Sequence, residues 1–401
     1  MMTPGIVIIG GGMAAARACI NLRASDYEGP ITFVSEETLL PYDRPPLSKS
    51  SIMEEGEPQP IYLLEPDIVA SLKVDARLGV AAQKIDRASK TITLMDGSVI
   101  PYTKLLMATG AKPRSLGPHA LTLRDHRDTL TLREKFIPHK SIVIIGGGFI
   151  GLELASSAIK RGCKVTLIEA QPRILMRGVP EPIAKIIHDR HLSAGVDLLV
   201  GTGIEEIAAH HVKLKDGRVI SADTIIAGIG ASPEVRLAQE AGLAIENGIA
   251  CNAMMQTSDP DIYAAGDCAS FEHQQFGKRL RLEAWRSAQE QSATAVANML
   301  GASKAHVAVP WFWSDQYELG LQIAGMADAG PVTITRQPAE GALLLFHVAL
   351  DGKLMGVSGI GPGNSIARDV KLAEMMIAKG MSPTAEALAD ASVPLKNLLK
   401  G

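Results

Sequence analysis

The chain has 401 residues, 46% of them hydrophobic and 21% charged, with a formal net charge of -3 at pH 7. This is the composition of an ordinary globular protein, and its length predicts two or three domains. The charge argues against a nucleic-acid binder, and the lack of any run of about 18 apolar residues argues against a membrane span. The first predicted strand starts within a few residues of Met1, so we expect no signal peptide and a cytoplasmic location.

Two stretches repeat one pattern, residues 6–16 (IVIIGGGMAAA) and residues 141–153 (SIVIIGGGFIGLE). Each predicts a buried parallel strand, a glycine turn and a helix, the order typical of a dinucleotide-binding unit. The first glycine of such a turn makes it tight, the second lets the backbone approach a pyrophosphate, and a third small residue lets the helix pack closely. These positions are held by Gly10, Gly12 and Ala15 in the first copy and by Gly146, Gly148 and Gly151 in the second.

Each copy is followed by a second predicted strand that ends in an acid. Residues 31–36 (ITFVSE) end in Glu36, and residues 164–169 (KVTLIE) end in Glu169. A carboxylate in this place can accept hydrogen bonds from a ribose diol, while the phosphates bind at the helix N-terminus. The sequence therefore predicts two dinucleotide sites.

Residues 39–49 (LLPYDRPPLSK) contain three prolines, which forbid a regular helix and favour a stiff loop. Such a loop can hold Arg44 and Lys49 in fixed positions; a rigid connector with solvated charges is the alternative. Asp-Gly pairs at residues 96–97 and 216–217 predict a hairpin in each half, and residues 105–110 and 224–230 predict a strand ending on glycine in each. The repeat spacing of about 136 residues indicates an internal duplication.

The remaining elements follow in chain order. A short predicted strand delivers Gly266 and Asp267 at its carboxyl end, where ligands bind in α/β sheets, although a turn or cap role for the acid is the alternative. Residues 281–300 predict a helix, residues 343–357 a hairpin with a two-residue turn at 351–352, and residues 367–377 a further helix. The cysteines are scattered without metal-like spacing, which predicts free thiols and no metal site. They are Cys19, Cys163, Cys251 and Cys268.

Together these motifs resemble those of the FAD-dependent ferredoxin reductases of bacterial oxygenase systems, the family of the biphenyl dioxygenase, putidaredoxin and rubredoxin reductases. The arginine-proline loop and the Trp-Phe-Trp-Ser-Asp-Gln stretch at residues 311–316 distinguish this branch from the disulfide reductases of the same fold. The matching motifs cover nearly the whole chain and lie at residues 10–15, 40–49, 108–114, 146–153, 228–233, 263–269, 283–285, 310–316 and 393–396.

The resemblance implies an α/β fold of the glutathione-reductase type, with two Rossmann-like domains and a C-terminal α+β domain. Residues 1–110 and 235–308 are expected to bind FAD, residues 111–234 to bind NAD, and residues 309–401 to form the C-terminal domain. The implied FAD contacts are Gly10, Gly12, Ala14, Ala15, Glu36, Arg44, Lys49, Ala82, Thr109, Gly110, Arg124, Gly266, Asp267, Trp285 and Trp313. The implied NAD contacts are Gly146, Gly148, Ile150, Gly151, Glu169 and Gly230.

The resemblance also places Lys49 and Glu153 near the flavin N5 as the catalytic pair. A fixed ammonium stabilises the negative charge that reduction brings, and a carboxylate partner orients it. The alternative for Glu153 is an acid favoured by the dipole at a helix N-terminus. Glu169 would repel a 2′-phosphate, so NADH is expected as the coenzyme, although Arg173 and Arg177 are close enough in sequence to accommodate that phosphate.

Because the chain lacks the redox cysteines of its disulfide-reducing relatives, electrons are expected to leave the flavin directly. The implied acceptor is a 2Fe–2S ferredoxin that supplies a Rieske dioxygenase or a cytochrome P450. Two alternatives stay open: a rubredoxin reductase or NADH oxidase-like flavoenzyme, and an NADH-responsive sensor resembling apoptosis-inducing factor. An acidic ferredoxin would dock on a basic face with the candidates Arg279, Arg281, Arg286, Arg368 and Lys371.

Overall fold

A computed structural model describes residues 3–399 of the chain, which form two compact units of α/β type. Unit 1 comprises the chain up to Asp43, Pro60–Lys112 and Ser232–Ala308, and unit 2 comprises Arg44–Gln59, Pro113–Ala231 and the chain from Val309. The loop of residues 44–59 therefore packs with unit 2. The three domains with the boundaries given above stay a prediction. Within residues 3–399, no helix is long and apolar enough to span a bilayer.

Unit 1 is built on a seven-stranded sheet. Six of its strands follow the order β3-β2-β1-β6-β5-β4, and the seventh, β17, pairs with β6. The first part of the long strand β6 pairs antiparallel with β5, and its second part lies parallel to β1 and β17. The strands are β1 (Gly5–Ile9), β2 (Ile31–Ser35), β3 (Val74–Leu78), β4 (Ala82–Asp86), β5 (Thr91–Leu94), β6 (Val99–Met107) and β17 (Ile262–Ala264).

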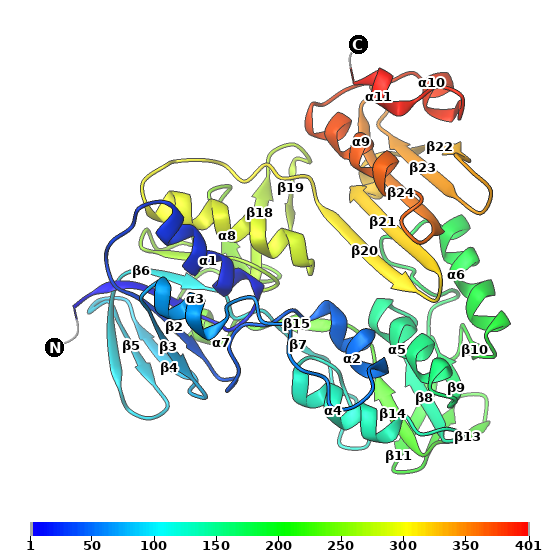
Figure 1. Cartoon of the computed structure of the whole chain (residues 1–401), viewed down its shortest axis with the longest axis horizontal. Coiled ribbons are helices and arrows are strands. Elements are labelled where there is room, and N and C mark those ends of the chain that lie inside the picture. The colour runs from blue at the N-terminus through cyan, green and yellow to red at the C-terminus, as the bar shows by residue number, and fades with distance from the viewer. Residues whose placement is uncertain (1–2, 400–401) are drawn as a thin grey trace. The chain divides into compact units, whose positions relative to one another are not determined.

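Helices α1 and α8 of unit 1 lie side by side (Figure 1) and pack against each other. A three-stranded sheet of order β16-β18-β19 completes the unit. Strands β7 and β15 pair with each other where the chain passes between the units. These elements are α1 (Met13–Ala24), α3 (Pro66–Ser71), β7 (Ala111–Pro113), β15 (Ala231–Pro233), α7 (Arg236–Glu240), β16 (Ile249–Cys251), β18 (Ala269–His273), β19 (Lys278–Leu280) and α8 (Trp285–Met299).

Unit 2 repeats the parallel arrangement in a sheet of order β10-β9-β8-β14, accompanied by the antiparallel sheet β11-β12-β13. Its buried Val, Ile and Leu side chains form a core with the helices that follow the strands. The elements are η1 (Pro45–Ser48), α2 (Ser50–Met53), α4 (His126–Lys135), β8 (Ser141–Ile145), α5 (Phe149–Lys160), β9 (Lys164–Ile168), α6 (Glu181–Ser193), β10 (Asp197–Leu199), β11 (Ile204–Ala208), β12 (His211–Leu214), β13 (Val219–Ser221) and β14 (Thr224–Ala227).

The C-terminal part of unit 2 is an antiparallel sheet of order β20-β21-β24-β23-β22 with α9 packed on β21 and β24 (Figure 1). The predicted helix over residues 367–377 is confirmed within one residue. The elements are β20 (Trp311–Gln316), β21 (Leu319–Gly325), η2 (Ala327–Ala329), β22 (Val332–Arg336), β23 (Leu343–Val348), β24 (Leu354–Pro362), α9 (Ala367–Ala378), α10 (Ala385–Ala389) and α11 (Leu395–Leu398).

The predicted duplication is confirmed, since β8 and α5 start 136 residues after β1 and α1. The predicted hairpins are also confirmed, but the two-residue turn at residues 351–352 is wrong. Ala349 and Lys353 close a three-residue loop, because Gly352 adopts a left-handed conformation (φ 88°) that adds one residue to the turn. The helix predicted from residue 281 begins later, at Trp285.

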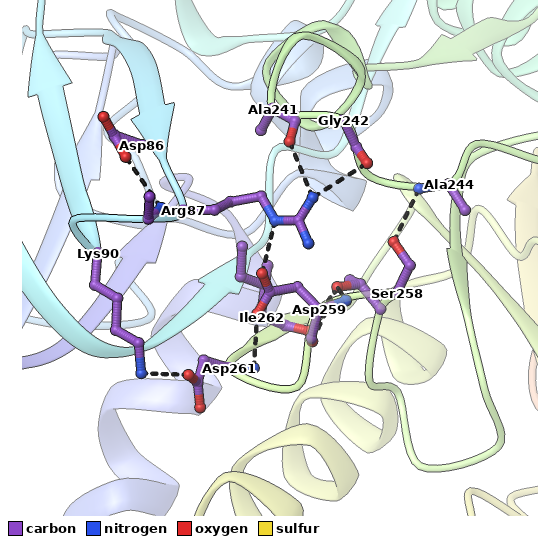
Figure 2. A network of polar contacts seen from close by, with 12 residues as sticks. Asp86, Arg87, Lys90, Ala241, Gly242, Ala244, Ser258, Asp259, Asp261 and Ile262 are labelled. Carbon is purple, nitrogen blue, oxygen red and sulfur yellow. Dashed lines mark hydrogen bonds and ion pairs between the residues drawn. The ribbon is translucent and has the colours of Figure 1, made fainter.

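A network of ion pairs connects the start of β17 to the β4–β5 hairpin of unit 1 (Figure 2). The Arg87 guanidinium donates to Asp259 at 2.6 Å and to the carbonyl oxygens of Ala241 and Gly242. Lys90 and Lys104 both pair with Asp261. These contacts lie where β17 begins, so they fix the strand that carries Gly266 and Asp267 past its other end.

Candidate functional site

The strands of unit 1 end together at one edge of the sheet. Ile9 of β1 is level with Val34 of β2 and Met107 of β6, and Met107 is level with Ala264 of β17. All four strands run parallel here, so the residues that follow them meet at the carboxyl edge, where α/β sheets bind ligands. This edge brings together five parts of the predicted FAD site, namely Gly10, Glu36, Thr109, Gly266 and Asp267.

The glycine turn after β1 has room for backbone only. Gly10 has a φ of 138°, and a Cβ added there would lie 2.1 Å from the carbonyl oxygen of Ala108. Gly12, which precedes α1, has no side chain to cap the helix, so no cap side chain accepts from the first N–H groups of α1. Ala14 and Ala15 are buried in the first turn. This geometry fits a pyrophosphate, whose charge would satisfy those N–H groups.

Gly266 brings the end of β17 against two helices. A Cβ added at Gly266 would lie 3.4 Å from the Cβ of Ala14 in α1 and 3.8 Å from that of Ala288 in α8. The Gly266 N–H donates to the Gln291 side chain of α8 at 2.8 Å. The neighbouring N-terminus of α8 starts at Trp285, whose indole N–H donates to Asp43 at 2.5 Å, and Ala284 before it cannot cap the helix. The Trp285 backbone is thus placed at a helix start without a side-chain cap, and its contact with FAD stays a prediction.

The other predicted FAD residues of unit 1 lie after β2, at the start of β4 and after β6. Glu36 is exposed at the end of β2, and the turn before β4 is tied to this loop because Gly79 and Val80 donate to the carbonyl oxygens of Glu37 and Ser35. That turn leads directly to Ala82, which is buried. After β6, the Thr109 hydroxyl donates to Glu234 O at 2.6 Å and Gly110 has a φ of 69°.

The second glycine turn, in unit 2, likewise has no room for a Cβ at two of its glycines. A Cβ added at Gly146 (φ 108°) would lie 2.4 Å from Gly228 O, and one at Gly151 would lie 2.0 Å from Gly146 O. Gly148 precedes α5 and, as glycine, cannot cap it. Ile150, in the first turn of α5, is a partly exposed apolar side chain. At Gly230 (φ 95°), no atom of residues 3–399 outside its chain neighbours lies within 4 Å of an added Cβ.

The acid that follows the second glycine turn, Glu169, is held in place by backbone N–H groups. Glu169 accepts hydrogen bonds from the backbone N–H groups of Gly147 at 2.6 Å and Gln171 at 2.7 Å. Arg173, which the sequence left as a possible phosphate partner, donates to the carbonyl oxygens of Ile174, Leu175 and Val179 instead. Its guanidinium is therefore engaged by its own loop, while Arg177 is exposed.

Lys49 and Glu153 form an ion pair within unit 2. The Lys49 Nζ lies 2.8 Å from Glu153 Oε2, and the side chains are 25% and 5% exposed. Glu153 also accepts from the Ser48 hydroxyl at 2.5 Å and from the Ser314 hydroxyl at 2.6 Å. Glu153 is the fifth residue of α5, beyond the first turn where the helix dipole acts, so its partners rather than the dipole account for its position.

Several contacts fix the loop that carries Lys49. Ser157 donates to Ser48 O at 2.7 Å, and Arg44 donates to Arg124 O at 2.7 Å, which brings two predicted FAD residues together. Arg133 of α4 donates to four carbonyl oxygens that follow Lys49 in the chain. These belong to Ser51, Ile52, Glu54 and Gly56.

The aromatic stretch of β20 has two faces. Trp311 and Trp313 stack with ring centroids 5.2 Å apart, while Phe312 packs on Phe149 of α5 at 4.2 Å. Packing therefore accounts for Phe312, and Trp313 keeps its predicted role near the cofactor as a prediction. Sequence reasoning missed Ser48, Ser314 and Asp43 as partners of site residues. Ser48 and Ser314 did stand inside the two motifs that distinguish the family.

The four cysteines are free and buried. Burial raises the pKa of the Cys19 thiol to about 12 and also raises the pKa of Cys163 and Cys268. The raised pKa values keep these thiols protonated at neutral pH, whereas reactive cysteines are typically ionised.

The basic candidates for docking are mostly paired. Arg281 pairs with Glu283 at 2.6 Å and Lys371 with Glu374 at 3.1 Å. Arg279 contacts Glu246 and Glu272, and Arg286 contacts Glu290. Arg368 is exposed on α9.

Comparison with known proteins gives a consistent result over the whole chain. Residues 4–292 match the family model for pyridine nucleotide-disulphide oxidoreductases, and residues 311–399 match that for the reductase C-terminal domain. The chain is 36% identical to the ferredoxin–NAD(+) reductase component of the anthranilate 1,2-dioxygenase system of Burkholderia cepacia, covering 100% of both chains. It is 34% identical to putidaredoxin reductase of Pseudomonas putida, covering 98% of this chain and 96% of the relative. A crystal structure of the covalent putidaredoxin reductase–putidaredoxin complex matches with a TM-score of 0.93 at 34% identity, over 100% of this chain and 99% of that one.

Proposed function

We propose that this chain, which belongs to the ferredoxin reductases within the pyridine nucleotide-disulphide oxidoreductase family, carries electrons from NADH through FAD to a 2Fe–2S ferredoxin. The observation that carries the proposal is the pair of glycine turns at residues 10–12 and 146–148, which we call the first and second glycine cradles. Each lies at the carboxyl edge of a parallel sheet, and each is followed by an acid at the next strand end. FAD, when bound, supplies the step from a two-electron donor to a one-electron acceptor.

The first cradle is proposed to hold FAD. The N–H groups at the start of α1 and the backbone of Gly10 and Gly12 would bind the pyrophosphate, Glu36 the ribose, and Ala82 the adenine through its backbone. Thr109, Gly110, Gly266, Asp267 and the backbone N–H of Trp285 would bind the rest of the cofactor. The family resemblance also assigns Arg44, Arg124 and Trp313 to the FAD contacts.

The second cradle is proposed to hold NADH. Glu169 would exchange its bonds to backbone N–H groups for the ribose hydroxyls and would repel a 2′-phosphate. The engagement of Arg173 by three carbonyl oxygens supports this preference, because the guanidinium is turned to its own loop. Ile150 and Gly230 would border the coenzyme.

Lys49 is proposed to place a positive charge beside the reacting part of the flavin, and Glu153 to orient it. A preorganised charge of this kind stabilises negative charge as it develops and costs no reorganisation. The Ser48 and Ser314 hydroxyls share the charge of Glu153, which leaves Lys49 less neutralised than in a simple pair. Because the cysteines are buried and poorly ionised, the electrons would pass to an external carrier.

Docking of an acidic ferredoxin is proposed to use the basic residues Arg281, Arg286, Arg368 and Lys371, with Arg279. Their ion pairs leave a modest net charge, so the electrostatic contribution would appear mainly in the association rate and its salt dependence. Reversing Arg281 and Arg286 to Glu should lower the rate of ferredoxin reduction at low salt and flatten its salt dependence. Unchanged turnover in this variant would remove the two residues from the docking face.

Stopped-flow absorbance of the anaerobic protein tests the function. We expect NADH to bleach the flavin faster than NADPH, and a 2Fe–2S ferredoxin to restore the flavin spectrum in two one-electron phases. If oxygen reoxidised the reduced flavin at a rate comparable to that with ferredoxin, the protein would be an oxidase. A reduced complex that no ferredoxin discharges would indicate an NADH-responsive sensor.

A further inference from the structure

Within unit 2, a continuous chain of hydrogen-bonded side chains runs from Glu153 to Tyr317. Ser314 Oγ lies 2.6 Å from Glu153 Oε1, and Gln316 Nε2 lies 3.2 Å from Ser314 Oγ. His191 Nε2 is 2.8 Å from Gln316 Oε1, and Tyr317 Oη is 3.1 Å from His191 Nδ1. Ser314 and Gln316 are two residues apart on β20 and therefore point to the same face of the sheet, while His191 belongs to the last turn of α6.

The charge at one end of this chain fixes the direction of every bond. Glu153 faces the Lys49 ammonium as a carboxylate and only accepts hydrogen bonds, so Ser314 must donate to it. The Ser314 oxygen then accepts from the Gln316 amide NH2, which turns the amide oxygen toward His191. His191 must in consequence carry its proton on Nε2, and its bare Nδ1 accepts from the Tyr317 hydroxyl.

The chain is buried from Glu153 to His191, and Tyr317 at its end is half-buried. Glu153, Ser314, Gln316 and His191 are all buried, with His191 fully inaccessible. Burial lowers the pKa of His191 to about 4, so the ring is neutral at neutral pH and offers one donor and one acceptor. Burial raises the pKa of Tyr317 to about 12, so its hydroxyl keeps the proton that it donates.

The outer end is held in an uncommon backbone conformation. Tyr317 has a φ of 56°, a left-handed value that an aromatic residue rarely adopts. Its ring lies under the Arg190 guanidinium at 4.0 Å, and Arg190 pairs with Glu318 through two bonds of 2.7 and 3.0 Å. Surrounding contacts thus hold Tyr317 where its hydroxyl reaches His191.

We infer that His191 is a positioning residue for the Lys49–Glu153 pair: its Nε2–H orients Gln316, which orients the Ser314 hydroxyl onto Glu153. A directed chain of this kind polarises each bond toward the carboxylate. Glu153 then stays turned toward Lys49 without cancelling the full charge of the ammonium. The effect on the flavin rests on the function proposed above, whereas the tautomer of His191 follows from the protein alone.

The same unit contains a matched control. His347 is buried, has its pKa lowered to about 4 by burial, and bonds through Nε2 to Ser358 at 3.1 Å. His347 lies on β23 and Ser358 on β24, and neither residue belongs to the chain that joins Glu153 to Tyr317. A buried histidine with a purely structural role should therefore behave as His347 does.

Imidazole nitrogen NMR of the histidine-labelled, FAD-loaded protein gives the first test. We expect His191 to be neutral with the proton on Nε2 from pH 8 to pH 5.5. A proton on Nδ1, or titration near pH 6.5, would overturn the inference whatever the enzyme does. This measurement uses the unaltered chain and does not depend on any variant folding.

Three variants give the second test. His191→Leu removes the donor, His191→Gln returns an N–H near the position of Nε2, and His347→Leu measures the cost of losing a buried histidine elsewhere. We expect His191→Leu to make the midpoint potential of the bound flavin more negative and to slow its reduction by NADH about fivefold, the scale of one hydrogen bond. His191→Gln should restore both, and His347→Leu should change neither.

Equal behaviour of His191→Leu and His347→Leu would overturn the positioning role. The proposed reductase function would survive that result, because it is judged by whether the unaltered protein passes electrons from NADH to a ferredoxin. Conversely, the positioning role would stand if the unaltered protein reduced no ferredoxin but showed the Nε2–H tautomer, and if His191→Leu shifted the potential of its flavin.

Discussion

The two glycine cradles share one backbone plan and differ in what surrounds them. In unit 1, β17 and α8 add to the β1–α1 turn, and Gly266 lies within 3.8 Å of both helices when a Cβ is added. In unit 2, the turn between β8 and α5 meets the end of β14, and the space around Gly230 is open within the described residues. The enclosed cradle suits a cofactor that stays bound, and the open one suits a coenzyme that exchanges in each turnover.

The largest effect should come from adding a Cβ to the first glycine of each cradle in turn. Gly10→Ala and Gly146→Ala both place a Cβ less than 2.5 Å from a carbonyl oxygen at a positive φ, so each should cost about 3 kcal/mol or more locally. Gly10→Ala should yield protein without FAD. Gly146→Ala should retain FAD, visible in its absorbance, but lose reduction by NADH.

Gly117→Ala is the control for these two variants, because it has a positive φ and no atom of residues 3–399 within 4 Å of the added Cβ beyond its chain neighbours. It should cost about 1 kcal/mol and leave both ligands bound. If Gly146→Ala also lost FAD, the assignment of one cradle to each ligand would be wrong.

The next effect concerns charge in the two units. Lys49→Met should slow reduction by NADH about 100-fold, the scale of a lost charge-stabilising group. It should also lower the free energy of unfolding by about 3 kcal/mol, because Glu153 is left buried without its ammonium. Adding Glu153→Gln should recover stability but not rate, as followed by denaturant unfolding and stopped-flow absorbance.

Arg87→Met in unit 1 is the contrasting variant. The Arg87–Asp259 pair lies at the start of β17, away from the carboxyl edge, so its loss should lower stability and leave the reduction rate of the FAD-loaded fraction unchanged. A rate loss equal to that of Lys49→Met would show that the ion pair in unit 2 has no special part in the chemistry.

The sequence predicted the two cradles well because their geometry is local. Gly10, Gly12 and the start of α1 lie within a few residues, and only glycine fits where a Cβ would meet a backbone oxygen. Lys49 and Glu153 came from the family resemblance rather than from spacing. The structure confirms that the two side chains form a pair.

The supporting residues were not predictable in the same way. Ser48 and Ser314 contact Glu153 across 105 and 161 residues of chain, and a single serine carries no sign of a distant partner. Helix α6 was not predicted, so His191 had no place in the site. The long-range contacts that orient a site depend on tertiary packing, which periodicity and turn signals do not report.

Acid should destabilise both units, because each contains a buried histidine with a lowered pKa. Burial lowers the pKa of His306 in unit 1 and of His347 in unit 2 to about 4, below the unfolded value near 6.5. The unfolded state then binds more protons between these values, so stability is complete above about pH 6.5 and falls as the pH drops toward 4. At pH 5 each histidine should cost about 2 kcal/mol.

Hydrogen exchange resolves this effect by unit. His306→Gln should flatten the pH dependence of amide protection in β18, and His347→Gln should flatten it in β23. If either variant altered the pH dependence of amide protection equally in both units, the two units would unfold as one cooperative body. The comparison between the units would then not extend to stability.

The smallest effect should separate the two acids. Glu169→Ala should raise the KM for NADH about tenfold, since it removes a carboxylate that two backbone N–H groups hold in place for the ribose. The variant should also discriminate less between NADH and NADPH, because the repulsion of a 2′-phosphate is lost.

Glu36→Ala should weaken FAD retention by less than tenfold, because β17 and α8 still enclose the first cradle. Steady-state kinetics with both coenzymes, beside FAD release measured by fluorescence, compares the two. A larger loss of FAD from Glu36→Ala than of NADH from Glu169→Ala would mean that the acid, and not the added elements, accounts for the tighter hold of the first cradle.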